Sequence, residues 1–578
     1  MGIIVWKILF QNHGPIISAQ DRNIEKVFKM QSFYLLSLQR PMNFPTRLIF
    51  TDQPITLEAT AMKPKNLLFI TADQWRGECL SALNHPTVKT PNLDKLASEG
   101  FLFKNHFAQC TPCGPSRASL YTGMYLQNHR SIHNGTPLDA RHTNIALEMR
   151  KLGYDPVLVG YTDTTADLRR YSANDPVLKT YEGILPGFSR VLAMPSTSFP
   201  EPWARWLEAK GYSLPGNLSD LYYKPMENYP GAENRGRTFA PACYSANESD
   251  TAFLTDQALQ YIRRPGDNPW FLHISYLRPH PPYLAPEPYN EMYHPDEVPP
   301  CVAGSSVKEK KKRHPYFKFL LDKNLNIGKY HSGKYPRDEG TMRQLRATYY
   351  GLMTEIDDNI GKILALLKET GQYDHTVIVF VSDHGDQLGD HGLIGKDSYF
   401  DRSFHIPLII RLPADRTNPR CGRIIDAFTE NIDILPTLLE LFSGEVPRQC
   451  DGVSLLPFFR GEPVKGWRTE VHWEVDFGFL DDYPDVQPGK ELGLASKECA
   501  FNVIRDAHYK YVHFTAMPPL FFDIKNDPEE LRNLADDSTY TGLMFEYARK
   551  MLSWRMANDE RTLTGMRAGP KGFIERIR

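Results

Sequence analysis

The sequence lacks a long apolar run and lacks an excess of charge of one sign. Its 67 basic and 69 acidic side chains give a formal net charge of −2 at pH 7, which offers no electrostatic footprint for nucleic acid or for an anionic membrane. The apolar stretch at residues 3–10 is too short to span a bilayer, contains Lys7 and is followed by no small-residue cleavage pattern. We therefore expect a cytoplasmic protein with no nucleic-acid partner and no membrane partner.

Cysteine is also sparse. Eight cysteines scattered over 578 residues do not have the dense spacing of a secreted disulfide scaffold, and this favours a reducing compartment. By contrast, hydrophobic residues make up 41% of the chain, which is enough to bury a large core and excludes disorder for most of its length. Any anionic substrate of such a nearly neutral protein must be captured locally.

Regular apolar periodicity begins abruptly at Lys65. Residues 1–62 lack it, so we interpret them as an N-terminal extension and Met62 as a candidate for the natural start. Residues 63–465 are predicted to form a catalytic domain, and residues 466–578 a smaller α+β domain with a polar tail.

Short apolar runs alternate with amphipathic segments, which indicates an α/β fold with a large, mostly parallel sheet flanked by helices. Strands are predicted at residues 66–71, 155–160, 270–275, 376–382 and 407–412. Helices are predicted at 91–99, after an N-cap at Thr90, and at 343–370. Alternating runs at 469–477 and 509–514 then predict a small antiparallel sheet, followed by a terminal helix.

A basic run at residues 308–314 interrupts the alternation. It is open to two interpretations, a nucleic-acid or targeting segment and a solvated insertion loop. The near-neutral charge of the rest of the chain favours the loop.

Polar residues directly follow four of the predicted strands. Because ligand sites of such sheets lie at the carboxyl ends of the strands, these residues are candidates for a shared site: Asp73-Gln74, Tyr161-Thr162-Asp163, Arg278-Pro279-His280 and Asp383-His384. Asp73, Asp383 and His384 offer two oxygen ligands and one imidazole nitrogen, a set suited to a divalent cation.

The pair Cys110-Thr-Pro-Cys113 has three interpretations. Two of them are a redox pair and half of a structural zinc site. A structural zinc needs two further ligands at similar spacing, and the chain contains no second such pair. The third interpretation begins at the second cysteine.

Cys113-Gly-Pro-Ser-Arg117, followed by Ala-Ser-Leu-Tyr-Thr-Gly123, resembles the Cys-x-Pro-Ser-Arg signature of the sulfatase family within the alkaline phosphatase superfamily. In that family the cysteine is oxidised to formylglycine. The stretch from Leu520 to Leu534, with Asp523, Asp527 and Asn533, resembles the usual sulfatase ending, so the resemblance covers about residues 63 to 540.

Within the family the chain is most similar to the phosphonate monoester hydrolases, which also cleave phosphate diesters. The similarity lies in Thr111-Pro-Cys-Gly-Pro115, Asn134 with Thr136-Pro-Leu138, Tyr161-Thr162, Arg278-Pro-His-Pro-Pro282 and Ser382-Asp-His-Gly385 running on to Gly395-Lys396. The resemblance implies that a metal is held by Asp73, Cys113, Asp383 and His384. It also implies a catalytic role for His280 and Lys396 beside Cys113, and substrate-binding positions at Gln74, Asn134, Tyr161, Asp163 and Arg117, with Arg117 supporting the nucleophile loop from behind. One position departs from that branch, because Asp163 replaces a threonine.

The function implied is hydrolysis of aryl sulfates, phosphonate monoesters and phosphate diesters by a formylglycine made from Cys113 and one divalent metal ion. Manganese is the expected metal, with calcium or zinc as the alternatives. The implied partners are a formylglycine-generating enzyme and a second copy of the chain, in a homodimer or homotetramer. Three alternatives are open: a strict arylsulfatase, an enzyme that keeps a plain cysteine, and a catalytically decayed binding protein on the same scaffold.

Overall fold

The structure is a computed structural model that describes residues 65–575, except 195–199, 237, 265, 267, 303, 305, 325–337, 414–420, 463 and 479–487. The predicted N-terminal extension, the start at Met62 and the apolar stretch at 3–10 lie outside the described residues.

Among the described residues, the large sheet has eight strands, and it confirms the predicted α/β class. Their order is β4(Arg190–Ala193), β3(Pro156–Gly160), β5(Phe271–Pro279), β1(Asn66–Asp73), β6(Thr376–Val381), β7(His405–Arg411), β2(Phe101–Phe107), β8(Arg423–Glu430). Only β7 runs against its neighbours, β6 and β2. The five predicted strands are present, whereas β2, β4 and β8 were not predicted.

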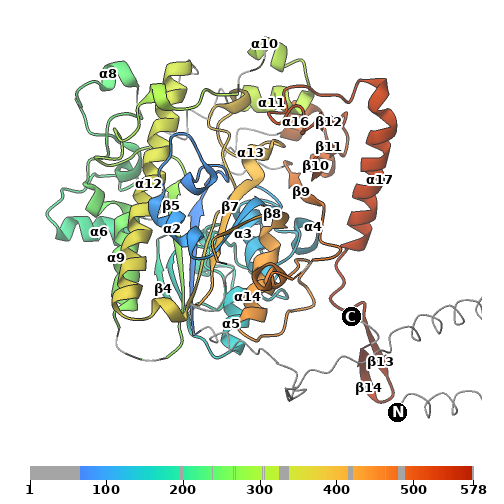
Figure 1. The fold of residues 1–578 in the computed structure, drawn as a ribbon, viewed down its shortest axis with the longest axis horizontal. Coiled ribbons are helices and arrows are strands. Elements are labelled where there is room, and N and C mark those ends of the chain that lie inside the picture. Colours follow the sequence, from blue (N-terminus) through green and yellow to red (C-terminus); the bar gives the residue numbers. More distant parts are fainter. Residues whose placement is uncertain are drawn as a thin grey trace, which may run out of the picture. The chain divides into compact units, whose positions relative to one another are not determined.

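Alternate residues of β1 face two different cores. Leu68 and Ile70 pack in one cluster, and Leu67 and Phe69 pack in the other, because successive side chains of a strand point to opposite faces. Figure 1 shows helices on both faces of the sheet. The face that bears Leu68 and Ile70 is covered by α2(Pro91–Ser98), α9(Asp250–Ile262) and α12(Glu339–Glu369). The face that bears Leu67 and Phe69 is covered by α3(Cys113–Thr122), α5(Ile145–Lys151) and α14(Ile434–Leu441).

The predicted helices at 91–99 and 343–370 correspond to α2 and α12. Pro91 occupies the first turn of α2 as expected, but the side chain of Thr90 makes no capping hydrogen bond to that turn. The smaller helices and helical turns of the molecule include α4(Leu126–His129), α6(Glu201–Ala209), α7(Asp220–Tyr223), α8(Ala232–Arg235), α11(Pro315–Asn324), α13(Asp401–Phe404), α15(Leu456–Arg460) and α16(Pro488–Leu492).

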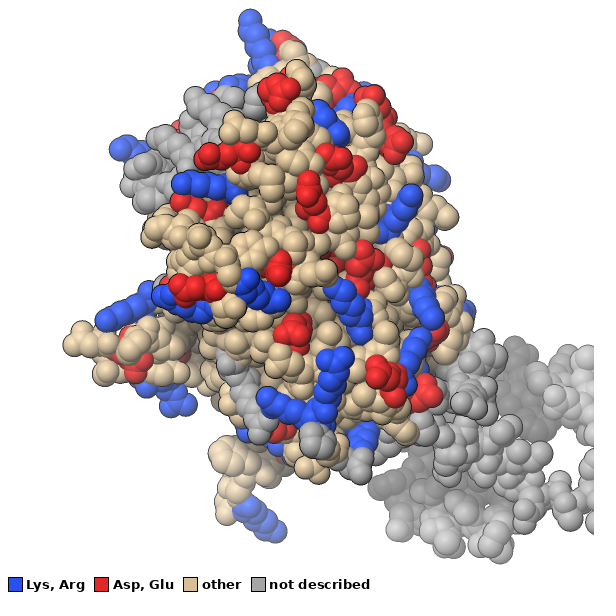
Figure 2. Space-filling model, turned by 90° about the vertical axis from the view of Figure 1, so that its left-hand side faces the viewer, with Lys and Arg blue, Asp and Glu red and all other residues tan. Residues whose placement is uncertain are grey.

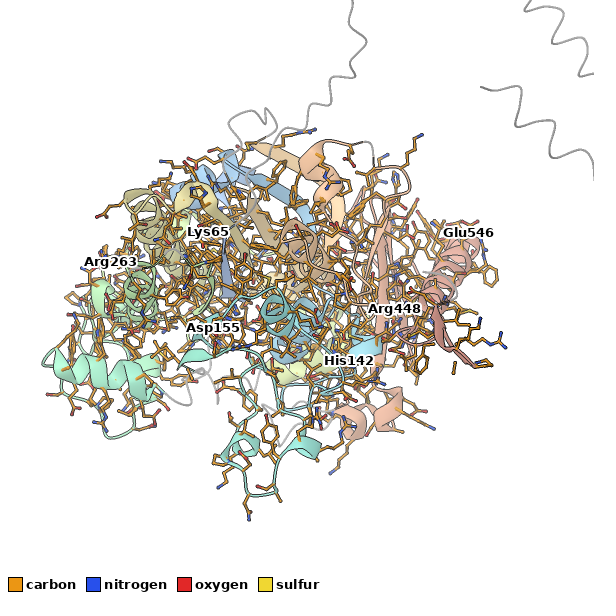
Figure 3. All side chains as sticks on the ribbon, turned by 90° about the horizontal axis from the view of Figure 1, so that it is seen from below. Lys65, His142, Asp155, Arg263, Arg448 and Glu546 are labelled. Carbon is orange, nitrogen blue, oxygen red and sulfur yellow. The ribbon has the colours of Figure 1, made fainter. Side chains whose placement is uncertain are left out.

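The C-terminal region contains the predicted antiparallel sheet and terminal helix. Its strands are ordered β12(Leu520–Asp523), β11(Tyr509–Phe514), β10(Ala500–Asp506), β9(Glu470–Asp476), and they are followed by α17(Thr541–Ala557) and the hairpin β13(Met566–Gly569)–β14(Gly572–Glu575). Trp473 of β9 stacks against Phe404 and Phe107, with ring centroids 4.8 and 5.9 Å away. The small sheet therefore shares an aromatic core with the large one. In Figure 3, Glu546 of α17 and Arg263 after α9 lie at opposite sides of the molecule.

The basic run at 308–314 forms the short helix α10(Val307–Lys310) and the turn after it. Lys310 is buried, Lys311 pairs with Asp322, and Lys312 pairs with Glu309. On the face drawn in Figure 2, basic and acidic side chains are interspersed. Within the part of the chain that the structure describes, no helix combines the length and the apolar character needed to cross a membrane.

Candidate active site at the carboxyl edge of the large sheet

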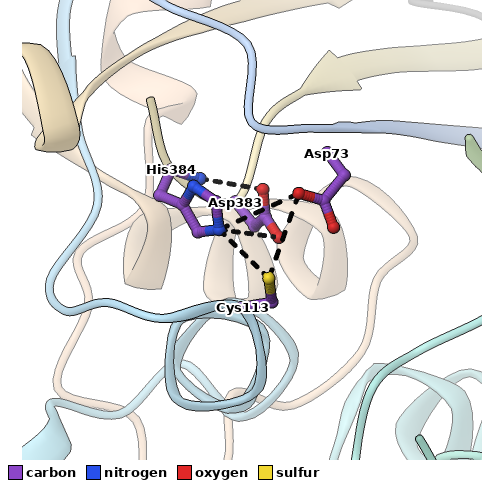
Figure 4. Close-up of side chains that lie close together, drawn as sticks. All are labelled: Asp73, Cys113, Asp383 and His384. Carbon is purple, nitrogen blue, oxygen red and sulfur yellow. Dashed lines mark hydrogen bonds and ion pairs between the residues drawn. The ribbon is translucent and has the colours of Figure 1, made fainter. Parts of the chain in front are cut away.

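Four potential metal ligands converge at the carboxyl ends of β1 and β6, which are neighbours in the sheet. Asp73 ends β1, Asp383 and His384 follow β6, and Cys113 opens α3. One ligand atom from each lies within 4.8 Å of the others, and all four side chains are buried (Figure 4). The pairing of β1 with β5 shifts register between Ala72 and Asp73, and such an irregularity changes the direction in which a side chain points.

The imidazole of His384 presents a lone pair to this cluster. Its Nδ1 lies 3.1 Å from the carbonyl oxygen of Gly385, to which it donates, so Nε2 is the acceptor nitrogen. That Nε2 lies 3.2 Å from Cys113 Sγ, 3.7 Å from Asp383 Oδ2 and 3.8 Å from Asp73 Oδ1. Burial lowers the pKa of His384, which keeps the ring neutral. The donor set fits a divalent cation.

Arg117 neutralises the two carboxylates from within the protein. Its Nε–H donates to Asp383 Oδ2 at 3.0 Å, its Nη2–H donates to Asp73 Oδ2 at 3.1 Å, and its Nη1–H donates to Ser275 Oγ at 2.9 Å. The hydroxyl of Tyr161 donates to Asp73 as well. Burial raises the pKa of Asp73, but the charges of His280, Arg117 and Lys396 outweigh burial and hold it well below its ordinary value. The fully buried Arg117 thus holds the two carboxylates of the cluster.

Lys396 lies directly against the nucleophile position. Its Nζ is 2.8 Å from Cys113 Sγ and donates to Gln74 Oε1 at 3.1 Å. Burial lowers the pKa of Lys396, but the adjacent sulfur of Cys113 and the carboxylate of Asp73 raise it above its ordinary value, so the side chain is a cation. Gln74 itself has a left-handed backbone, with φ of 68°. Its N–H donates to Asp383 Oδ1 at 3.0 Å, and its carbonyl accepts from the hydroxyl of Tyr349 at 2.7 Å.

Asn134 and Asp163 approach the start of α3 from two other loops. Asn134 Oδ1 accepts the N–H of Gly114 at 2.9 Å. A Cβ on Gly114 would lie 3.1 Å from Asn134 Oδ1 and 3.2 Å from the carbonyl oxygen of Asp163, so this position favours glycine. Asp163 has a φ of 51° and is buried. Burial and the charge of Asp73 raise the pKa of Asp163 to about 7.

His280 follows β5, whose Pro279 pairs with Asp73 in the sheet register. Its Nδ1 lies 2.6 Å from the carbonyl oxygen of Pro281, to which it donates. The side chain is partly exposed, and its charge is one of the causes that lower the pKa of Asp73. The residues predicted for the site thus come from strand β1, from helix α3 and from loops at this edge of the sheet.

Cys110 does not join the cluster. Its Sγ is buried and lies 3.5 Å from Ser119 Oγ, and both Cys110 and Cys113 are free thiols. The structure therefore lends no support to the redox or zinc interpretations of this pair.

Several supporting residues were not predicted. Asp386 accepts hydrogen bonds from Gln74 and from Tyr283, and Ser275 accepts one from Arg117. Asp386 lies within the polar stretch 383–391, which is dense in carboxylates and imidazoles. Ser275 and Tyr283 carry no such signal, because each is a single polar residue in or near an apolar strand.

The fold and the position of this cluster define an α/β protein with a candidate metal site at the carboxyl edge of a mostly parallel sheet. The model of the sulfatase family matches residues 65–444, and a model described as N-sulphoglucosamine sulphohydrolase, C-terminal, matches residues 389–557. The chain belongs to the sulfatase family.

Three relatives locate the chain within this family. It is 44% identical over 525 residues to the multifunctional alkaline phosphatase superfamily protein PehA of Trinickia caryophylli, covering 89% of this chain and 100% of the relative. It is 28% identical to an arylsulfatase of Clostridium perfringens, covering 89% of this chain and 98% of the relative. The crystal structure of a phosphonate monoester hydrolase of Agrobacterium radiobacter superposes with a TM-score of 0.82 at 41% identity, over 89% of this chain and 100% of that one. The protein is therefore a sulfatase-fold hydrolase that is similar to phosphonate monoester hydrolases and related to arylsulfatases.

Proposed function

We propose that the protein is a formylglycine- and metal-dependent hydrolase of monoanionic esters, namely aryl sulfates, phosphonate monoesters and phosphate diesters. The observation that carries the proposal is the buried convergence of Asp73, Cys113, Asp383 and His384 beside the ammonium group of Lys396. The similarity to a phosphonate monoester hydrolase over the whole of that chain supports the same function.

The site fits one divalent ion. The ion would be held by Asp73, Asp383, His384 and position 113. Arg117 would keep the carboxylates of Asp73 and Asp383 oriented through its ion pairs with them. When bound, the ion would supply Lewis-acid polarisation, and a formylglycine at position 113 would supply a nucleophilic hydroxyl. The nitrogen ligand favours manganese, with calcium and zinc as the alternatives.

The environment of Cys113 disfavours a plain thiol nucleophile. Burial and the charge of Asp73 raise the pKa of the Cys113 thiol well above its ordinary value. Because the thiolate is the reactive form, an unmodified cysteine here would be a weak nucleophile. This supports oxidation to formylglycine by a formylglycine-generating enzyme. Each of the eight cysteines is free, which fits the reducing environment of the cytoplasm.

Protein residues would handle the leaving group and the negative charge. Lys396, in contact with position 113, and His280, on the loop after β5, would stabilise or protonate the leaving oxygen. Gln74 accepts a hydrogen bond from Lys396, Asn134 accepts one from Gly114, and Tyr161 donates one to Asp73. These three side chains would orient the ester. Asp163 would set a limit on the negative charge that the site accepts.

Charge favours monoanionic substrates. Sulfate monoesters, phosphonate monoesters and phosphate diesters carry one negative charge near neutral pH, whereas phosphate monoesters carry close to two, with a second pKa of about 6. One divalent ion and Lys396 are partly offset by Asp73, Asp383 and Asp163. We expect phosphate monoesters to be the poorest substrates of the four classes.

Three measurements test the proposal. Mass spectrometry of the peptide at residues 105–125 should find formylglycine at position 113, and fully active protein with only unmodified Cys113 would refute the formylglycine requirement. A panel of nitrophenyl esters that share one leaving group should then rank phosphate monoesters last by kcat/KM. A phosphate monoester in first place would overturn the charge argument, and elemental analysis of the enzyme purified without added metal identifies the ion.

Two alternatives remain distinguishable by the same panel. Hydrolysis of sulfates alone would make the enzyme a strict arylsulfatase, like the Clostridium perfringens relative by name. Hydrolysis of no ester by fully modified, metal-loaded protein would indicate a decayed binding protein.

We also propose a homodimer or homotetramer. Helix α17 exposes Phe545, Leu552 and Met556, and the following hairpin exposes Phe573 and Ile574, an apolar area suited to a second copy of the chain. Light scattering at micromolar concentration tests this, and a monomer would refute it.

A further inference from the structure

Asp386 is a buried carboxylate that joins three separate segments of the active site. Its side chain is fully buried. Oδ2 accepts from Gln74 Nε2 and, at 2.5 Å, from the hydroxyl of Tyr283. Oδ1 accepts from the backbone N–H groups of Leu388 at 2.8 Å and Gly395 at 2.9 Å. All four of these donors are neutral, so the carboxylate acts here as an organiser of hydrogen-bond donors.

Each of these segments contains or adjoins a residue of the proposed site. Gly395 immediately precedes Lys396, and Gln74 accepts a hydrogen bond from Lys396. Tyr283 belongs to the loop after β5 that carries His280. One carboxylate thus ties together the segments of both groups proposed to act on the leaving oxygen.

The bond to Gln74 also fixes which end of its amide faces Lys396. Because Nε2 donates to Asp386, Oε1 must be the atom that faces Lys396 Nζ, 3.1 Å away. An amide in the opposite orientation would present a donor to an ammonium group, which has donors only. The ammonium is then held between Gln74 Oε1 and the Sγ of Cys113, 2.8 Å from Nζ.

We propose that Asp386 is a positioning residue that fixes Lys396 and the His280 loop relative to position 113, and so sets the efficiency with which the leaving oxygen is protonated. This inference rests on the proposed ester hydrolysis. It assigns to Asp386 no contact with the substrate.

Asp386→Asn is the primary test, because asparagine keeps the shape but places an NH₂ donor where only donors converge. Tyr283→Phe is a milder second variant that removes one of the four donors. Asp357→Asn and Tyr276→Phe are matched controls away from the site. Asp357 is also buried and accepts the N–H groups of Asn92 and Leu93, and the buried Tyr276 hydroxyl bonds Thr255.

The first readout is kcat/KM over a series of aryl esters, from nitrophenyl to unsubstituted phenyl, whose leaving group has a pKa of about 10. Proton transfer from a positioned group contributes roughly 10²–10⁴-fold. We expect Asp386→Asn to lose at least about tenfold more activity on phenyl than on nitrophenyl esters, with formylglycine and metal content unchanged. Tyr283→Phe should change the dependence of kcat/KM on the leaving group in the same direction but by less. Both controls should show the same dependence on the leaving group as wild type.

The second readout is independent of turnover. Reductive methylation followed by peptide mass spectrometry should find Lys396 modified faster in Asp386→Asn than in wild type or in Asp357→Asn. Equal losses across the ester series together with unchanged Lys396 labelling would overturn the proposal, and so would loss that metal depletion alone explains. If Asp386→Asn fails to fold, Tyr283→Phe decides between the same outcomes. A wild-type enzyme inactive on every ester would refute the proposed function, while the labelling would still decide the positioning role.

Discussion

Two clusters of buried charged groups in this molecule shift the pKa of a carboxyl group in opposite directions, downward for Asp73 and upward for Glu355. At the carboxyl edge of the sheet, Asp73 and Asp383 are both ion-paired with Arg117. In the second cluster, Arg278 at the end of β5 lies 3.4 Å from Asp250 of α9, and Glu355 of α12 is buried with neither carboxylate oxygen accepting a hydrogen bond of ordinary geometry from the described residues. Burial and the charge of Asp250 raise the pKa of Glu355 to about 8.

The difference shows that burial alone does not define a metal site. Cationic partners hold the pKa of Asp73 well below its ordinary value, so its charge is available to an ion. Glu355 instead is kept as a neutral acid through most of the physiological range. The first cluster also brings four potential metal-ligand atoms close together. Among the described residues, Asp250 and Glu355 belong to no such group of potential metal ligands.

The largest expected effect is loss of the nucleophile. Cys113→Ala should lower turnover by several orders of magnitude without unfolding the protein, because the nucleophile and one metal contact disappear together. Cys113→Ser should be nearly as damaging, since an ordinary hydroxyl has no second oxygen from which to expel the product. Steady-state kinetics check both, with Cys110→Ala as the neighbouring-thiol control. Retention of more than about a tenth of the rate by Cys113→Ser would refute the formylglycine mechanism.

The next effect separates the two clusters by metal content. Asp383→Ala or His384→Ala should reduce metal occupancy and, as its consequence, activity by at least about 100-fold, with partial rescue by excess metal. Glu355→Gln should leave metal content and turnover close to wild type. Elemental analysis and kinetics on the same samples check this. Full activity in a metal-free Asp383→Ala enzyme would end the single-metal hypothesis.

The third effect concerns stability and its pH dependence. Glu355 has a pKa of about 8 in the folded protein and an ordinary value of 4.5, so folding takes up a proton between these values. Its contribution to stability is full below about pH 4.5 and is lost as the pH rises toward about 8. Glutamine does not titrate, so Glu355→Gln does not lose stability through this side chain as the pH rises. The variant should gain stability over wild type as the pH rises, by roughly 1.4 kcal/mol per unit and a few kcal/mol at most.

Thermal or denaturant unfolding at about pH 5 and about pH 8 measures this difference. Glu369→Gln, at the exposed end of the same helix, is the control and should show no such trend. A constant difference between Glu355→Gln and wild type at both pH values would show that Glu355 is ionised in the folded protein.

Much of the first cluster could be predicted from the sequence, and little of the second. Asp73, Asp383 and His384 follow apolar strands, and Cys113 to Arg117 carry a family signature.

Strands β2, β4 and β8 were not predicted because β2 contains Lys104 and Asn105, β4 has four residues, and β8 begins exposed.

The supporting contacts could not be predicted because they depend on tertiary packing. Asp250 and Glu355 lie in helices whose apolar spacing is ordinary, and nothing local indicates that the two carboxylates are buried near each other. The four bonds to Asp386 come from segments as far as 312 positions away from it in the sequence. Only the folded chain brings such donors to one carboxylate.

The smallest expected effect is on substrate choice at Asp163. Its carboxylate lies where a substrate anion would be repelled, but the charges of Arg117 and Lys396 offset part of that repulsion, so a change of a few-fold in ranking is expected. Asp163→Thr would restore the residue of the similar branch, yet a β-branched side chain at a φ of 51° is strained. Asp163→Asn is therefore the cleaner variant, because asparagine tolerates the left-handed conformation and removes only the charge.

On the nitrophenyl panel, Asp163→Asn should raise kcat/KM for phosphonate monoesters and phosphate diesters relative to aryl sulfates, whose oxygens each carry less charge. Asp163→Thr should show the same change in ranking with a lower folding stability, and an unchanged ranking in both variants would show that Asp163 does not select the substrate.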